Sequence, residues 1–172
     1  PHTTKSEGFF ISMLKKPNAG HHIRIKEDKP KNSDRQSTAV LAEYFQNADE
    51  LVSIVKDDRL YTFPKKHYSL FAYLMKKLFI RQTGIFAGNQ KEKNFIPSEE
   101  LALALDLKTE IASVEVDLET ALNYLRCENI SLPGVATGWT LIKFQDFPLG
   151  WVKVLDRRVN NYFPKEWRIL NK

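Results

Sequence analysis

The stretch Phe147-Pro148-Leu149-Gly150-Trp151-Val152-Lys153 decides the fold of this chain, together with Arg157-Arg158-Val159-Asn160-Asn161-Tyr162-Phe163-Pro164-Lys165-Glu166-Trp167-Arg168. Strand-forming residues dominate both segments and turn residues separate them, so a β-rich unit is predicted. Cations, aromatics and amides mix through it without an acid–base or metal-binding constellation. This combination is more typical of a protein that binds an anionic polymer than of an enzyme.

The same β pattern extends in both directions from this stretch. Residues 139–144 alternate as a strand, Gln145-Asp146 is a turn, and a second strand over 148–155 leads to a third near 159–163. Upstream, the pattern predicts helices over 38–45, 67–78, 97–105 and 117–126, a hairpin of strands 51–56 and 60–64, one or two strands over 79–87, and a strand at 114–116. The predicted fold class is therefore α+β.

The chain divides at a polar segment. Residues 15–37 hold few apolar residues and are predicted to be a linker. The segment 1–14 before them contains the apolar run 8–14, which is predicted to be a buried strand. After the linker we expect a small α+β domain over 38–78 and a compact β unit with flanking helices over 79–172.

Charge is unevenly spread along the 172 residues, whose net charge is +5. Residues 56–93 carry nine Lys/Arg against three Asp/Glu, and residues 143–172 carry seven against three. Residues 98–128 carry two against eight. One interpretation is that the two basic segments face the same anionic partner. The other is that their Lys and Arg side chains only solvate two separate surfaces.

The compartment and membrane class follow from composition. A single cysteine, Cys127, forms no internal disulfide and fits a reducing compartment. No apolar run approaches the roughly 20 residues that span a bilayer. We therefore expect a cytoplasmic protein without a membrane partner.

No residue set for chemistry is found. Cys127 has no partnering base nearby in the sequence, and His21-His22 lies in the linker without other metal ligands. His2 and His67 are solitary. We expect no catalytic residue, no metal site and no cofactor in this chain, and favour binding.

Three motifs carry a resemblance. The first is the pair of stretches quoted at the outset; the second runs from Gly84 and Gly88 through Lys91, Phe95 and Pro97-Ser98 to Leu101-Ala102-Leu103-Ala104-Leu105; the third is Pro1-His2 with Gly8-Phe9-Phe10-Ile11-Ser12. In their order along the chain, the three motifs resemble the C-terminal region of bacterial Sun-type (RsmF/YebU-like) rRNA cytosine-5 methyltransferases, which includes a PUA-like domain.

The resemblance implies a division of labour. Residues 1–14 would be a terminal strand of the methyltransferase domain, 38–78 an intervening small domain, and 79–172 a PUA-like mixed β-barrel. The S-adenosylmethionine site and the family's catalytic cysteines would lie in the parent enzyme, upstream of this chain. This chain would then be the RNA-binding, substrate-targeting module, without catalytic activity of its own.

The resemblance also implies a site. Its partner would be structured ribosomal RNA, alongside the parent's own methyltransferase domain, and the chain is expected to be a monomer. Asn160, Phe163 and Glu166 depart from the family pattern. The expected RNA-binding residues, from the motifs and the basic segments, are Arg81, Lys91, Lys93, Lys153, Arg157, Arg158, Asn161, Lys165 and Arg168.

Two alternatives stay open. Each aromatic among the cations either stacks on bases or packs in the core. The module as a whole is either an RNA binder or a protein-docking module anchored by Trp151, Tyr162 and Trp167. Docking through apolar anchors would be nearly insensitive to salt, whereas RNA binding would weaken as salt rises.

Overall fold

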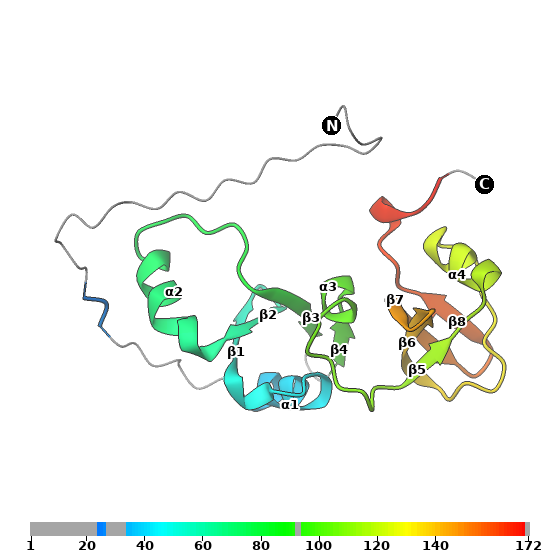
Figure 1. The fold of residues 1–172 in the computed structure, drawn as a ribbon, viewed down its shortest axis with the longest axis horizontal. Helices are drawn as coiled ribbons and strands as arrows, with labels where there is room; N and C mark the ends of the chain where they lie inside the picture. The colour runs from blue at the N-terminus through cyan, green and yellow to red at the C-terminus, as the bar shows by residue number, and fades with distance from the viewer. Residues whose placement is uncertain (1–23, 27–33, 92–93, 171–172) are drawn as a thin grey trace.

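Two four-stranded sheets lie along the long axis of the molecule, with short helices packed against them (Figure 1). The structure, a computed structural model, describes residues 24–26, 34–91 and 94–170. The predicted mixture of helices and strands is confirmed. The two sheets are separate and neither closes into a barrel within the described residues, so the expected barrel is not found as a closed one. The predicted terminal strand, most of the linker and Lys93 lie outside the described residues.

The first sheet has the order β1-β2-β3-β4 and is antiparallel throughout. Its strands are β1 (Leu51–Lys56), β2 (Arg59–Pro64), β3 (Ile85–Lys91) and β4 (Asn94–Pro97). The predicted β1–β2 hairpin is confirmed. Asp57 and Asp58 form its two-residue turn with φ of 51° and 60°, which is the geometry that favours tight hairpins. The boundary predicted between residues 78 and 79 falls inside this sheet, because β2 pairs with β3; the division into domains there stays a prediction.

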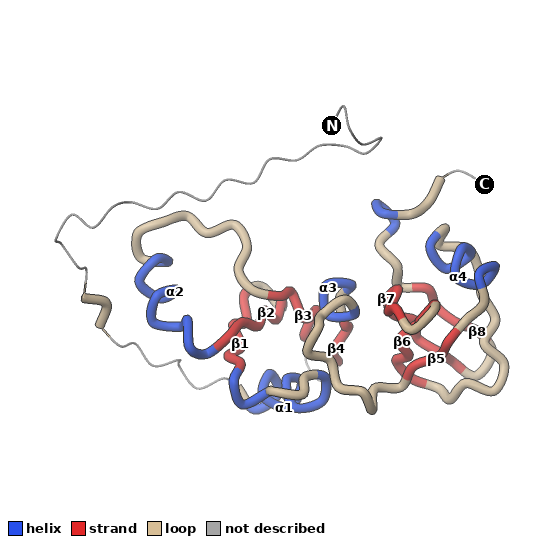
Figure 2. The backbone as a smooth tube through the Cα atoms, in the orientation of Figure 1, coloured by secondary structure: helices blue, strands red, loops and turns tan. Residues whose placement is uncertain are grey.

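The second sheet has the order β5-β6-β7-β8, with β5 parallel to β6 and the other pairs antiparallel. The strands are β5 (Ser113–Glu115), β6 (Gly138–Phe144), β7 (Phe147–Leu155) and β8 (Arg158–Asn161). The β strands predicted over this region are therefore confirmed, with shifted ends. Figure 2 shows helix α4 (Leu118–Leu125) beside this sheet. Tyr124 of α4 packs with Ile142, Val152 and Val154 in a buried cluster.

Three helices are shorter than the sequence pattern predicts, whereas the first begins earlier and is longer. The helices are α1 (Arg35–Tyr44), α2 (Tyr68–Met75), α3 (Glu99–Ala102) and α4, with single turns η1 (Ala48–Glu50), η2 (Lys65–His67) and η3 (Lys165–Trp167). Asp34 caps the first helix, accepting a hydrogen bond from the Ser37 backbone N–H at 2.8 Å. The helix predicted through residue 105 ends at Ala102, and Leu105 is fully exposed.

One hydrophobic core joins the two sheets. Leu60 and Ala87 of the first sheet belong to the same buried cluster as Leu141 and Trp151 of the second. The connecting segment is fixed to the end of α1: Phe45 pairs with Leu107, and the Lys108 ammonium donates to the Ala42 carbonyl. A cation at the last carbonyls of a helix is electrostatically favoured. The second sheet is therefore held in a fixed position against α1 and α3.

Candidate nucleic-acid interface

Strand β7 presents two faces of different character. Val152 and Val154 point toward α4, because they belong to the cluster around Tyr124. Successive side chains alternate across a strand, so Trp151 and Lys153 point to the opposite face. This opposite face is covered at Trp151, which is only 1% exposed. The Trp151 indole N–H donates to the Ser98 carbonyl at 2.9 Å. Trp151 is thus a core residue, and the core alternative holds for it.

The open part of this face carries a cation against aromatic rings. The Lys153 ammonium lies 5.4 Å from the centre of the Trp139 ring, a cation–π distance. The Tyr162 ring contacts Trp139 edge-on, with centroids 4.5 Å apart. Tyr162 is 38% exposed. Proteins that bind single-stranded nucleic acids combine aromatic rings, which stack on bases, with cations, which contact phosphates. This cluster offers both on neighbouring strands.

Strand β8 extends the open face. Asn160 lies directly opposite Lys153 in the β7–β8 register, and Arg158 lies two residues before it on the same side. Arg157 sits in the exposed turn that joins the two strands. Lys153, Arg158 and Asn160, with Trp139 and Tyr162, are called the open-face cluster below. The structure thus groups two of the basic residues that the sequence predicts.

Asn161 points the other way and has structural partners. Its amide nitrogen donates to the Tyr124 carbonyl at 2.8 Å, and its amide oxygen accepts from the Phe163 backbone N–H at 2.9 Å. The Phe163 ring packs on Tyr124 with centroids 5.4 Å apart. These two motif residues hold the chain after β8 against α4. A role for Asn161 in RNA contact stays a prediction.

The C-terminal cations lie along α4. The Ile169 backbone N–H donates to the Leu125 carbonyl at 3.0 Å, which fixes the segment that carries Lys165, Trp167 and Arg168. All three are exposed, Trp167 by 57%. Their part in binding stays a prediction.

The remaining described residues of the predicted site, Arg81 and Lys91, lie upstream of the second sheet in the chain. Arg81 is exposed in the loop from α2 to β3, beside Arg59 and Lys56, at the end of the molecule far from β8 (Figure 1). Lys91 ends β3 next to Gln90, which contacts Asp34 and Ser37 at the start of α1. The structure does not bring Arg81 together with the open-face cluster.

A buried carboxyl lies under β7. Glu99, the first residue of α3, is 8% exposed, and its Oε2 has no hydrogen-bond partner among the described residues. Burial raises its pKa to about 8. Gly150 lies against it: a Cβ at Gly150 would collide with both Glu99 carboxyl oxygens and with the Tyr124 hydroxyl. Burial, with the Glu99 charge second, also raises the pKa of Tyr124.

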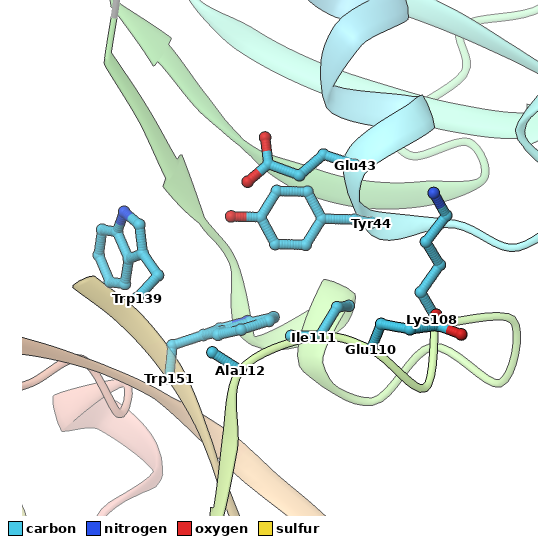
Figure 3. A pocket seen from close by; sticks show the side chains of 8 residues that line it. All are labelled: Glu43, Tyr44, Lys108, Glu110, Ile111, Ala112, Trp139 and Trp151. Atoms are coloured by element: carbon cyan, nitrogen blue, oxygen red, sulfur yellow. The ribbon is translucent and has the colours of Figure 1, made fainter. Parts of the chain in front are cut away.

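A cavity of about 490 Å³ opens between α1, the connecting segment and the second sheet. Figure 3 shows Tyr44, Trp139 and Trp151 around it, with Glu43 beside the Tyr44 ring. Lys108, Glu110, Ile111 and Ala112 complete the lining. The sequence analysis missed Trp139 and Tyr44 as site residues. The sequence could have indicated Trp139, because its strand directly precedes the motif strand and the two strands pair in a hairpin. Tyr44 comes from a helix 95 residues before Trp139, and no pattern in the sequence indicates that the two residues meet.

The described residues hold neither a metal site nor a membrane span. No group of three or more His, Cys, Asp or Glu side chains in them is arranged to hold a metal ion. None of the helices in this part of the chain is long and apolar enough to cross a membrane.

Comparison with known proteins finds a family similar to the second sheet and α4. Residues 112–169, which contain β5 to β8 and α4, match the family model described as the methyltransferase RsmF PUA domain. The chain matches the C-terminal part of RsmF-type rRNA methyltransferases. The predicted family resemblance is thus confirmed, and the PUA match agrees with the mixed α+β fold.

Similar proteins include the ribosomal RNA small subunit methyltransferases F of three Shewanella species. Identity is 27% over 180 residues for Shewanella oneidensis, 26% over 179 for Shewanella loihica and 26% over 179 for Shewanella pealeana. Each alignment covers 96% of this chain but only 36%, 36% and 35% of the relative. The chain therefore spans little more than a third of the length of these methyltransferases.

Proposed function

We propose that this chain is the RNA-binding, substrate-targeting module of an S-adenosylmethionine-dependent rRNA cytosine-5 methyltransferase. It would hold structured ribosomal RNA while a methyltransferase domain elsewhere in the parent protein supplies the cofactor and the catalytic cysteines. The place of action would be the cytoplasm. The similarity to RsmF-type enzymes supports the class of RNA, and nothing in the comparisons favours the docking alternative.

The open-face cluster is the observation that carries the proposal. Its cations stand on a rigid sheet, next to rings that bases stack on, and no acidic side chain of β7 or β8 faces them. Affinity would come chiefly from phosphate contacts, which release counterions and weaken as salt rises. Trp139 and Tyr162 would add stacking energy that salt leaves largely unchanged.

Salt titration of RNA binding tests the proposal. Replacing Lys153 and Arg158 together with Ala should weaken binding to a structured rRNA fragment and reduce the slope of log K against log salt by about one unit for each lost phosphate contact. Replacing the exposed pair Lys65 and Lys66, on the first-sheet side, removes equal charge as a control. Equal losses from both pairs, or binding that ignores salt, would contradict the assignment.

A further inference from the structure

We propose that the cavity beside the open-face cluster receives one unpaired guanine base of the bound RNA. The inference rests on the proposed function and specifies what part of the RNA the module reads. The cavity lies between Tyr44 of α1 and Trp139 of β6, with Trp151 on a third side (Figure 3). Its volume of about 490 Å³ falls within the range of sites that hold small ligands.

The aromatic lining suits a base rather than a phosphate. Tyr44 and Trp151 meet edge-on at 87° with centroids 5.6 Å apart and are almost fully buried, so they form the apolar floor of the cavity. Trp139, which is only partly buried, offers the ring on which a base can stack. Stacking on aromatic side chains contributes roughly 1–3 kcal/mol per base and is open to any base. Bases inside a helix are already stacked and paired, so only an unpaired one enters such a cavity.

The carboxylates then select among the bases. Glu43 lies beside the Tyr44 ring, and within the described part of the chain no hydrogen bond or salt bridge engages its carboxylate. Glu110, also in the lining, accepts from the Thr109 hydroxyl at 3.0 Å and is therefore less free. A carboxylate repels phosphate and only accepts hydrogen bonds. Guanine carries two adjacent N–H donors on its Watson–Crick edge, N1–H and the 2-amino group, and a carboxylate accepts both together.

The other three bases fit less well. Adenine and cytosine each present one amino group beside a ring nitrogen that accepts, and uracil presents one N–H between two carbonyls. Each leaves one carboxylate oxygen without a donor or against an acceptor, so each forms fewer hydrogen bonds with the exposed Glu43 than guanine does. The Lys153 ammonium, 5.4 Å from the centre of the Trp139 ring, would then contact the phosphate beside the inserted base. Base and phosphate would thus be held by different residues of one site.

Three RNA hairpins with the same stem test the inference on the whole chain. One has an all-uridine loop, one has a single guanosine in that loop, and one has inosine at the guanosine position, which lacks the 2-amino group. We expect the guanosine loop to bind about tenfold more tightly than the uridine loop, the size of one well-formed base contact, with inosine between them. A blunt duplex of the same stem measures binding to the backbone alone.

Variants assign the preference to the cavity. Glu43→Gln should abolish the guanosine preference while leaving binding to the duplex intact. Glu119→Gln removes one exposed carboxylate from α4, on the opposite side of the second sheet, and should preserve the preference. The indole N–H signal of Trp139, assigned by Trp139→Phe, should shift in NMR spectra with the guanosine loop and not with the duplex.

The outcomes separate the inference from the proposed function. Salt-dependent binding of all RNAs with equal affinity for the three loops would overturn the guanine pocket and leave the RNA-binding function standing. Absence of RNA binding altogether would overturn both. A Trp139 shift produced by an arginine-rich peptide but by none of the RNAs would assign the cavity to a cationic protein side chain, and would also overturn the inference.

Discussion

The indole N–H of Trp151 donates a hydrogen bond to the backbone carbonyl of Ser98 at 2.9 Å. Trp151 lies in the family-matched second sheet, and Ser98 caps α3 beside the first sheet, where its hydroxyl accepts from the Leu101 N–H at 3.1 Å. The Trp151 ring also packs edge-on against Tyr44 of α1. One side chain thus fastens the second sheet to two helices of the other half, and both halves should unfold together.

Trp151→Phe should therefore lower the free energy of unfolding by about 2–3 kcal/mol, since it leaves a small void and a buried carbonyl without its donor. Urea denaturation followed by far-UV circular dichroism measures the change. Trp167→Phe is the control, because Trp167 is 57% exposed and its replacement should change stability by less than about 0.5 kcal/mol. A second unfolding transition in the Trp151 variant would mean that the halves had come apart.

Gly150 is required by close packing rather than by a turn. It sits inside β7 with φ of 148°, and a Cβ there would collide with the Glu99 carboxyl and the Tyr124 hydroxyl. Gly150→Ala should destabilise the fold by about 2 kcal/mol or more, the cost of overpacking added to backbone strain. Gly134→Ala is the matched control: its φ is 79°, yet no atom lies within 4 Å of the new Cβ, so about 1 kcal/mol is expected. Thermal melts of the two variants should differ clearly.

Local signals in the sequence predicted the local structure well. Asp117 caps α4, which lies within the helix predicted over 117–126, and accepts from the Thr120 N–H at 2.8 Å. The hairpin of β6 and β7 follows from alternation around the turn Gln145-Asp146. Side-chain chemistry within four residues decides such features. The resemblance of the motif strand to a known family is the basis of the proposed functional class, which no periodicity in the chain indicates.

Contacts between distant segments escaped the sequence analysis. The pairing of β2 with β3 joins strands on both sides of the loop between α2 and β3, and neither strand shows its partner in its own pattern. The helix expected through residue 105 stops at Ala102 because Leu105 finds no core, while Leu107 pairs with Phe45 instead. The cavity depends on the same long-range packing, which is why Tyr44 gave no signal.

The buried carboxyl of Glu99 should make stability fall as pH rises. Its pKa is about 8 in the folded chain against an ordinary value of 4.5, so between these values the folded state keeps a proton that the unfolded state has lost. The stabilisation is complete below about pH 4.5 and is lost as pH rises to 8, at up to about 1.4 kcal/mol per pH unit. Glu99→Gln mimics the protonated form and should remove this part of the pH dependence, raising stability at pH 8. Urea midpoints across pH 5–9 provide the measurement. An unchanged pH profile in the variant would place the titration elsewhere.

Asn161 separates a structural role from an RNA contact. Asn161→Ala removes its hydrogen bonds to the Tyr124 carbonyl and from the Phe163 N–H, so we expect a loss of about 2 kcal/mol in unfolding free energy. Because its amide faces α4 and not the open-face cluster, RNA affinity measured well below the melting temperature should stay within about twofold of the parent chain. Asn160→Ala, one residue earlier on the open side, should do the reverse, with little effect on stability and a measurable loss of affinity. If the Asn161 variant instead loses RNA binding while its stability is unchanged, the amide contacts RNA directly and the motif residue has kept the role that the family resemblance gives it.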